Sequence, residues 1–400
     1  MTTKYDNQIW LSYVISEYSP SLPSRRAIIP ATASDAPVGE TGVSMTGKRT
    51  RSVSLHDELE AARPAGFRPA REAAAEVRRS VVGQDEAVGA ICEGVAMMAA
   101  RARAVAAGVD RDDLPRCSSI LVVGPSGSGK TYAVRQVAKA FGLPSLVVDA
   151  SAVTGEGWRG DSVSTRVRDA SRLAGESEAG MCLVVWDEID KMALKGHDRE
   201  KSFDPQPNLL KILDGGEVAF YDRDGEVSGR YDADRLIHVL SGAFTGIEDV
   251  APSMRRVPGF SAGGAREAPV GGLSTEDFEA WGMSRELQGR VGMVVRMPAL
   301  GAADLELVVK GGPRSLEARF GRLMPPGSSF GVSDAAARHI ARRAAASGLG
   351  ARACERELSE VAARCLADAA PGSRSSFAVL LGSDGVMMAR RDERPLLPSG

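Results

Sequence analysis

The segment GPSGSGKT, residues 124–131, follows the apolar run ILVV and leads into the helical stretch TYAVRQVAKAFG. Glycines in such a loop let successive backbone N–H groups and the helix N-terminus face a polyphosphate. Lys130 would then reach the terminal phosphates, and Thr131 would hold a magnesium ion. The preceding loop residues are Gly124, Pro125, Ser126, Gly127, Ser128 and Gly129. We therefore predict a site for ATP and Mg²⁺. A glycine-rich turn with an incidental lysine is the alternative, and the flanking strand and helix disfavour it.

A pair of carboxylates ends a second apolar run further along the chain. Residues 182–186, CLVVW, are followed directly by Asp187 and Glu188. A buried strand with two adjacent carboxylates at its carboxyl end suits a nucleotide enzyme, so we predict that Asp187 binds magnesium and that Glu188 polarises the attacking water. An acidic strand end that only caps the next helix is the alternative. The two motifs alone also permit a small-molecule kinase, because they specify the nucleotide and not the acceptor.

Short runs rich in β-branched residues alternate with helical stretches in the middle of the chain. These runs are SSILVVG near Ile120, SLVVDAS near Val147, MCLVVWDE near Val184 and LIHVLSGAF near Val239. Near-continuous apolar strands separated by helices predict an α/β fold, in which a parallel sheet carries helices on both faces. After Pro298 helical patterns dominate and one strand, SSFAVLLGS, follows. This pattern predicts a smaller, mainly helical second domain.

The composition divides the chain into four predicted parts. Residues 1–64 are rich in Ser, Thr, Pro and small residues, which predicts a flexible arm. Residues 65–298 form the predicted large α/β domain and residues 299–385 the predicted small domain. Residues 386–400 are predicted to be a tail, in which the segment from Arg391 has no packing signal.

The overall balance of residues excludes several classes of protein. The 400 residues contain 43% hydrophobic and 26% charged residues, as in a globular chain rather than a disordered or membrane-embedded one. Fifty basic residues against 52 acidic residues give a net charge of −2 and no electrostatic footprint for nucleic acid or anionic lipid. The five cysteines form no CxxC pair and the four histidines no HExxH motif, so no zinc site is predicted. Since the N-terminus also lacks a signal-peptide pattern, we expect a cytoplasmic protein.

From about residue 81 to residue 370 the chain resembles the AAA+ protein-unfolding ATPases of the ClpX and HslU group, part of the Clp/Hsp100 family. The matching segments, in chain order, are VVGQDEAV, TGEGWRGDSV, WDEIDK, NLLKILDG, SGAF, ELQGR and GAR. In this family the first segment precedes the phosphate loop and packs near adenine, so the resemblance places Val82 at the nucleotide. The family architecture is an AAA+ P-loop domain followed by a smaller helical domain.

The resemblance also implies three further roles in the nucleotide site. Arg290, in ELQGR, matches the arginine finger, which in the family is contributed from a neighbouring subunit. Arg352, in GAR, matches the second sensor, which contacts the phosphates. Ser241, in SGAF, is the candidate for the first sensor, and a strand-capping serine is an equally good interpretation. For the two arginines the alternative is an ordinary surface arginine.

The segment around Trp158 stands where the family has its substrate-gripping pore loop. Trp158, Arg159 and Gly160 follow Gly157, and an aromatic side chain between glycines can pack on polypeptides of any sequence. The family normally has Tyr followed by an apolar residue, so Arg159 departs from the pattern. Burial of Trp158 in the core is the alternative. VPGF, residues 257–260, resembles in position a peptidase-docking loop, and an ordinary mobile loop is an equal alternative.

The function implied by the resemblance is ATP-dependent protein unfolding by a ring, expected to be a homo-hexamer, that threads polypeptide substrates through its pore. A ClpP-like or HslV-like peptidase would be the partner. The zinc module of ClpX and the inserted domain of HslU are absent from the sequence, so substrate recognition is not transferred. Two alternatives are kept: an ATP-gated adaptor or remodelling protein acting without a peptidase, and a DNA-remodelling motor, for which only Arg159 speaks.

Overall fold

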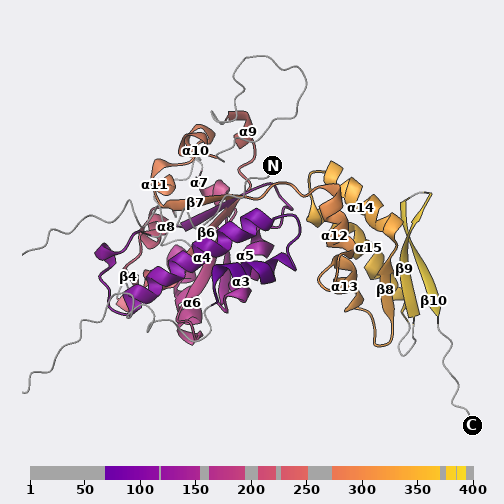
Figure 1. Cartoon of the computed structure of the whole chain (residues 1–400), viewed down its shortest axis with the longest axis horizontal. Coiled ribbons are helices and arrows are strands. Elements are labelled where there is room, and N and C mark those ends of the chain that lie inside the picture. Colours follow the sequence, from indigo (N-terminus) through magenta and orange to yellow (C-terminus); the bar gives the residue numbers. More distant parts are fainter. Residues whose placement is uncertain are drawn as a thin grey trace, which may run out of the picture. The chain divides into compact units, whose positions relative to one another are not determined.

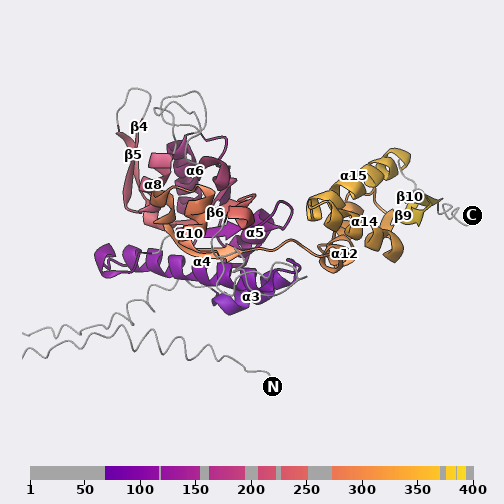
Figure 2. The same cartoon turned by 90° about the horizontal axis from the view of Figure 1, so that it is seen from above.

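The computed structural model describes residues 68–116, 119–153, 162–193, 206–221, 227–250, 273–369, 375–383 and 385–392 (Figures 1 and 2). Three sequence predictions fall outside these residues. They concern the arm at residues 1–64, of which only the sequence is known here, the pore-loop residues Trp158, Arg159 and Gly160, and the VPGF segment at residues 257–260.

A five-stranded parallel sheet forms the first part of the fold, in the order β2-β3-β6-β1-β7. Each neighbouring pair in this sheet is parallel. Its strands in chain order are β1 (Ser119–Val123), β2 (Ser145–Asp149), β3 (Cys182–Asp187), β6 (Leu236–Gly242) and β7 (Val291–Arg296). The predicted parallel α/β sheet is confirmed, and β7 is a fifth strand that the sequence does not predict.

Burial follows strand position in the sheet. Strands β1 and β6 are buried at every residue, and β3 is buried at all residues except Asp187. The outer strands β2 and β7 are partly exposed. The apolar runs of the inner strands are therefore a consequence of being covered on both faces. The interrupted pattern of β7, VGMVVR, has the alternation of an edge strand and gives a weaker signal.

Helices cover both faces of this sheet. The buried residues of α3 (Ala70–Arg78), α4 (Asp85–Ala106) and α5 (Lys130–Ala140) join one core cluster with Val122 and Val239. On the other face, Leu121 and Trp186 lie in a second cluster. Figure 2 shows the sheet between the layer of α3 and α4 and the layer of α6 and α8. The helices that contribute to the second cluster are α6 (Val163–Glu176), α7 (Ile189–Ala193), α8 (Gln206–Leu213), α9 (Ile247–Val250), α10 (Thr275–Trp281) and α11 (Arg285–Gln288).

A two-stranded antiparallel hairpin is inserted between α8 and β6. It consists of β4 (Glu217–Tyr221) and β5 (Val227–Asp232). A 3-10 turn, Ala233–Arg235, connects β5 to β6. Asp234 in this turn forms ion pairs with Arg101 of α4 and with Arg111. These ion pairs tie the base of the hairpin to the helical layer on the opposite side.

The second part of the fold contains four helices and a three-stranded sheet in the order β10-β9-β8. Strand β9 pairs parallel with β8 and antiparallel with β10. Leu305, Ile340, Leu358, Phe377 and Val379 are among the buried residues of its core. The elements are α12 (Ala302–Lys310), α13 (Leu316–Gly321), β8 (Ser329–Val332), α14 (Asp334–Ala346), α15 (Ala351–Asp368), β9 (Ser375–Gly382) and β10 (Gly385–Asp392).

None of the helices in the described part of the chain combines the length and the apolar character needed to cross a lipid bilayer. The longest of them, α4, contains five charged residues, which are Asp85, Glu86, Glu93, Arg101 and Arg103.

The prediction of an unpacked tail from residue 386 is wrong for residues 386–392. These residues form most of β10, which pairs with β9 along its whole length. Val386 and Met388 pack against the core of the second part, whereas Met387 between them is 52% exposed. The guanidinium carbon of Arg390 lies 6.0 Å from the centre of the Phe377 ring. The alternation of apolar and exposed positions in β10 is only a few residues long and is followed by a charged segment. The sequence therefore gives only a weak prediction of a strand here.

Truncation tests the contribution of β10. A chain that ends at residue 385 should lose at least about 2 kcal/mol of unfolding free energy, because Val386 and Met388 leave the core and β9 loses its ladder partner. A chain that ends at Asp392 retains β10 and is the matched control. The measurement is urea denaturation followed by circular dichroism, and equal unfolding curves for the two truncations would contradict the expectation.

Candidate functional site

A cavity of about 600 Å³ lies at the carboxyl ends of β1, β3 and β6. Residues 126–131 of the GPSGSGKT loop line it, together with Asp187, Glu188 and Val82. Gly124 and Pro125 do not line the cavity, but they form the start of the loop, and their carbonyl oxygens accept hydrogen bonds from Lys130. A side chain at Gly124 would place its Cβ 2.0 Å from the carbonyl oxygen of Met297, so only glycine fits between β1 and the end of β7.

Lys130 lies at the start of α5 with its ammonium over the loop. Its Nζ donates hydrogen bonds to the carbonyl oxygens of Gly124, at 2.6 Å, and of Pro125, at 3.0 Å. Burial lowers the pKa of Lys130, and the carboxylate of Asp187 acts against this shift. These backbone acceptors hold the ammonium at the loop, where phosphate oxygens would be its charged partners.

Thr131 and Asp187 meet across the site. The Oγ1 of Thr131 donates a hydrogen bond of 2.6 Å to the Oδ2 of Asp187, which ends β3. Two hard oxygen donors at one point suit Mg²⁺, which keeps water and phosphate oxygens as its other ligands. Within the described ranges no group of three or more His, Cys, Asp or Glu side chains is arranged to hold a metal ion. A magnesium ion at Thr131 and Asp187 would therefore depend on the phosphates for further ligands.

Glu188 follows Asp187 in an unusual backbone conformation. Its φ is 57°, a left-handed value that non-glycine residues rarely adopt and that is common at functional sites. Its backbone N–H donates to the Oδ1 of Asp187 at 3.1 Å. The carboxylate pairs with Lys191, and the hydrogen bond between them raises the pKa of Lys191. The two side chains are 43% and 59% exposed, so this ion pair is weak and leaves the carboxylate free to turn towards a water.

The sequence reasoning missed Gln84 and Asp190, which support the site. Gln84 is buried, and its Nε2 donates to the carbonyl oxygens of Ser128, at 3.3 Å, and Pro298, at 2.8 Å. Asp190 lines the cavity and accepts a hydrogen bond of 3.3 Å from the backbone N–H of Phe244. Gln84 lies in VVGQDEAV and Asp190 in WDEIDK, so the motifs contained both residues. Four arginines on separate elements also line the cavity, without a signal in the sequence: Arg79, Arg135, Arg314 and Arg319.

The GAR segment meets the phosphate loop from the second part of the fold. The Nη1 of Arg352 donates a hydrogen bond of 2.8 Å to the Oγ of Ser126. The backbone N–H of Ala351 donates to the carbonyl oxygen of Gly127 at 3.2 Å. Leucine and valine residues of the same part face the cavity, as does Val82. These apolar residues, which would suit a nucleotide base, are Leu300, Leu307, Val308 and Leu316.

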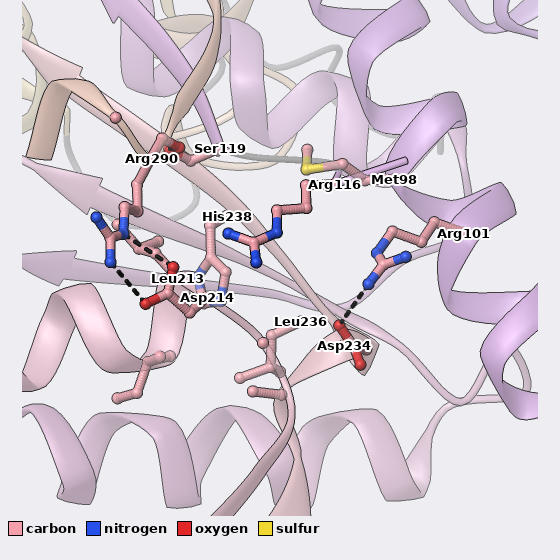
Figure 3. Close-up of a pocket in the computed structure, with 14 residues that line it drawn as sticks. Met98, Arg101, Arg116, Ser119, Leu213, Asp214, Asp234, Leu236, His238 and Arg290 are labelled. Atoms are coloured by element: carbon pink, nitrogen blue, oxygen red, sulfur yellow. Dashed lines mark hydrogen bonds and ion pairs between the residues drawn. The ribbon is translucent and has the colours of Figure 1, made fainter. Parts of the chain in front are cut away.

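Ser241 and Arg290 do not line this cavity. Ser241 is completely buried in β6 and its hydroxyl has no hydrogen-bond partner in the described part of the chain, whereas the following Gly242 reaches the cavity. Arg290 precedes β7 and lines a second cavity (Figure 3). Its Nε and Nη2 each donate a hydrogen bond of 2.8 Å to the carboxylate of Asp214. The sensor and arginine-finger roles of these two residues stay predictions.

Two glycines of the loop give a matched test of its backbone. Gly127 and Gly129 both have a positive φ, 77° and 93°, but only a Cβ at Gly127 would meet another group, the carbonyl oxygen of Leu349 at 2.0 Å. Gly127→Ala should therefore lower nucleotide affinity by about tenfold more than Gly129→Ala, which suffers backbone strain alone. Titration with a fluorescent ATP analogue measures both variants. Equal affinities would show that the contact with Leu349 does not shape the loop.

Comparison with known proteins agrees with this geometry. Residues 120–251 match the model of the ATPase family associated with various cellular activities (AAA). The ATP-dependent Clp protease ATP-binding subunit ClpX 2 of Wolinella succinogenes is 29% identical over 258 residues, 61% of this chain and 64% of that protein. The ClpX subunit of Azotobacter vinelandii is 31% identical over 258 residues, 59% of this chain and 58% of that protein. The ClpX subunit of Porphyromonas gingivalis strain ATCC 33277 is 31% identical over 204 residues, 46% of this chain and 49% of that protein.

The chain thus spans less than two thirds of the length of these relatives. The family match begins at Ile120, in β1, and ends after β6, so it contains the phosphate loop, Asp187 and Glu188. Residues 120–251 are therefore similar to the ATPase domain that this family model describes, and about three fifths of the chain is similar to ClpX subunits.

Proposed function

We propose that the chain is an ATP-hydrolysing protein unfoldase that acts as a ring. The observation that carries the proposal is the convergence of Lys130, Thr131, Asp187 and Glu188 on one cavity, with Thr131 and Asp187 in direct hydrogen-bond contact. These residues come from two strand ends separated by 56 positions in the sequence. A site that only bound a nucleotide would not need the carboxylate of Glu188 beside that of Asp187.

Each residue of the site has a separate task in the proposed hydrolysis. The loop N–H groups and Lys130 hold the β- and γ-phosphates of ATP. Thr131 and Asp187 would hold Mg²⁺, which neutralises charge on the phosphate oxygens. Glu188, once turned away from Lys191, accepts a proton from the water that attacks the γ-phosphorus, and ADP leaves. Arg352 contacts the loop at Ser126 and would connect the phosphates with the second part of the fold.

Arg290 would act on the nucleotide of a neighbouring subunit. Its carbonyl oxygen accepts hydrogen bonds from the N–H and the Oγ of Ser119, each at 2.9 Å, at the amino end of β1. The phosphate loop leaves the carboxyl end of the same strand, and five strand residues span about 16 Å. The guanidinium therefore lies far from the phosphates held by its own chain. A role in trans makes hydrolysis depend on assembly, for which we propose a homo-hexamer.

Polypeptide substrates are the third element of the proposal. The relatives described above are named as ATP-binding subunits of an ATP-dependent Clp protease, which supports a partnership of this chain with a ClpP-like or HslV-like peptidase in the cytoplasm. Trp158, with Arg159 and Gly160, is the proposed substrate-gripping loop. These three residues lie outside the described part of the chain, so the proposal for them depends on the sequence alone.

Replacement of the proposed base gives the first test of this mechanism. Glu188→Gln should lower ATP turnover by at least about 100-fold, because proton acceptance from water is lost, while ATP affinity stays within about twofold. Phosphate release and binding of a fluorescent ATP analogue measure the two effects. Lys130→Ala is the comparison variant, in which binding itself should fall. Unchanged turnover in Glu188→Gln would remove Glu188 from the mechanism.

Replacement of Trp158 separates threading from ATP hydrolysis. Trp158→Ala should abolish ATP-driven unfolding of a fluorescent model protein while basal ATP turnover stays within about twofold, because the loop contacts substrate and not nucleotide. Arg159→Ala is the neighbouring control and should retain unfolding of a neutral substrate. Unfolding by Trp158→Ala at the wild-type rate would instead favour an ATP-gated adaptor that does not thread its partner.

A further inference from the structure

The second cavity, of about 130 Å³, lies at the amino ends of β1 and β7 (Figure 3). Its volume exceeds the roughly 30 Å³ that a water molecule occupies in the liquid. Arg101, Arg116 and Arg290 line it with Asp214 and Asp234. None of the motifs in the sequence uses Arg101, Arg116, Asp234 or the neighbouring His238. The cavity is therefore separate from the phosphate loop and has no role in the proposed function other than through Arg290.

Two of the three arginines are already paired. Arg290 makes the two hydrogen bonds with Asp214 described above, and its pKa is raised by them. The Nη2 of Arg101 lies 3.6 Å from the Oδ1 of Asp234, whose other carboxylate oxygen pairs with Arg111. Arg116 makes no hydrogen bond or ion pair with any other described residue, and Figure 3 shows it extended towards His238. The cavity thus has an excess positive charge at Arg116.

His238 offers a buried hydrogen-bond donor to the same cavity. The side chain is only 5% exposed, and its Nδ1 accepts a hydrogen bond of 3.2 Å from the Nε1 of Trp186. The indole N–H can only donate, so Nδ1 carries no proton and the proton of the neutral ring is on Nε2. Burial lowers the pKa of His238 to about 4, which keeps the ring neutral at pH 7. The Nε2 has no hydrogen-bond partner among the described residues.

We propose that this cavity binds a phosphate group between the guanidinium of Arg116 and the Nε2–H of His238. The Nε2–H of His238 is buried and has no partner among the described residues, so it requires an acceptor. The guanidinium of Arg116, which is exposed and pairs with no other described residue, favours an acceptor with negative charge. A phosphate presents three or four acceptor oxygens in different directions, which suits two donors that come from the segment before β1 and from β6. The phosphate is either free inorganic phosphate, the product of the proposed hydrolysis, or the terminal phosphate of a nucleotide on a neighbouring subunit. Only the second source depends on the proposed function.

Titration of inorganic phosphate tests the free source. The full chain with Lys130→Ala, which weakens the first phosphate site, should still bind phosphate in isothermal calorimetry. Adding Arg116→Gln should weaken this binding by at least about tenfold, and Arg116→Lys by less, since it retains the charge but not the planar fork. Arg364→Gln, at an exposed position on α15, is the matched control and should bind as the parent does. Acetate is the comparison anion, and equal affinity for acetate would overturn the assignment to phosphate.

Mixed subunits test the neighbouring source. Arg116→Gln and Glu188→Gln chains should each hydrolyse ATP slowly, whereas their mixture should exceed the sum, because a Glu188→Gln neighbour can lend Arg116 to an intact Glu188 site. Circular dichroism checks that Arg116→Gln is folded. Restored turnover supports the neighbouring source, and calorimetric binding that depends on Arg116 supports the free source. The proposal is overturned when phosphate binding is independent of Arg116 and the mixture restores nothing. Absence of ATP hydrolysis by the wild-type chain would refute the proposed function but leave the calorimetric test valid.

Discussion

Hydrogen bonding of β1 between β6 and β7 determines where both cavities lie. At its carboxyl end, the N–H of Gly124 donates to the carbonyl oxygen of Gly242 at 3.3 Å, and the N–H of Met297 donates to Val123 at 2.7 Å. At its amino end, Ser119 holds the carbonyl oxygen of Arg290. Parallel pairing aligns all carboxyl ends at one edge of the sheet, which is why the loop, Asp187 and Glu188 converge there. The same alignment gathers Arg116, Arg290 and the start of β6 at the opposite edge.

Trp186 and Asp187 connect these two edges through β3. Trp186 is fully buried and donates its indole N–H to His238, which lines the second cavity, while the next residue, Asp187, accepts from Thr131 in the first. The indole of Trp186 reaches diagonally to His238, which lies two positions before Leu240, the residue that pairs with Trp186 in the sheet. A small displacement of β3 would therefore change both hydrogen bonds.

The tertiary structure, and not the composition, brings positively charged side chains together in the two cavities. The net charge of −2 gives no expectation of anion binding, yet arginines from separate elements line both cavities. In the first cavity, Arg79, Arg135, Arg314, Arg319 and Arg352 line the wall together with Lys130. In the second cavity, Asp214 and Asp234 neutralise two of the three guanidinium groups. Arg116 has no ion-pair partner in the part of the chain that the structure describes, and this is the feature that separates the proposed phosphate site from a structural ion-pair network.

Much of the nucleotide site could be predicted from local sequence, because it consists of contiguous segments with their own conformational demands. GPSGSGKT requires glycines at left-handed positions, and the apolar run before Asp187 requires a buried strand, so the sheet and the loop follow from the residues themselves. By itself the sequence determined these elements, the α/β class and the family resemblance. Only the tertiary structure decided that Ser241 lies outside the cavity, that Arg290 pairs with Asp214, that residues 386–392 complete a sheet, and that Arg116 faces His238. The burial of Ser241 and the contacts of Arg290 and Arg116 depend on residues far apart in the chain, for which local propensity and spacing carry no signal. Strand β10 pairs with the neighbouring β9, but its short, charged sequence predicts it only weakly.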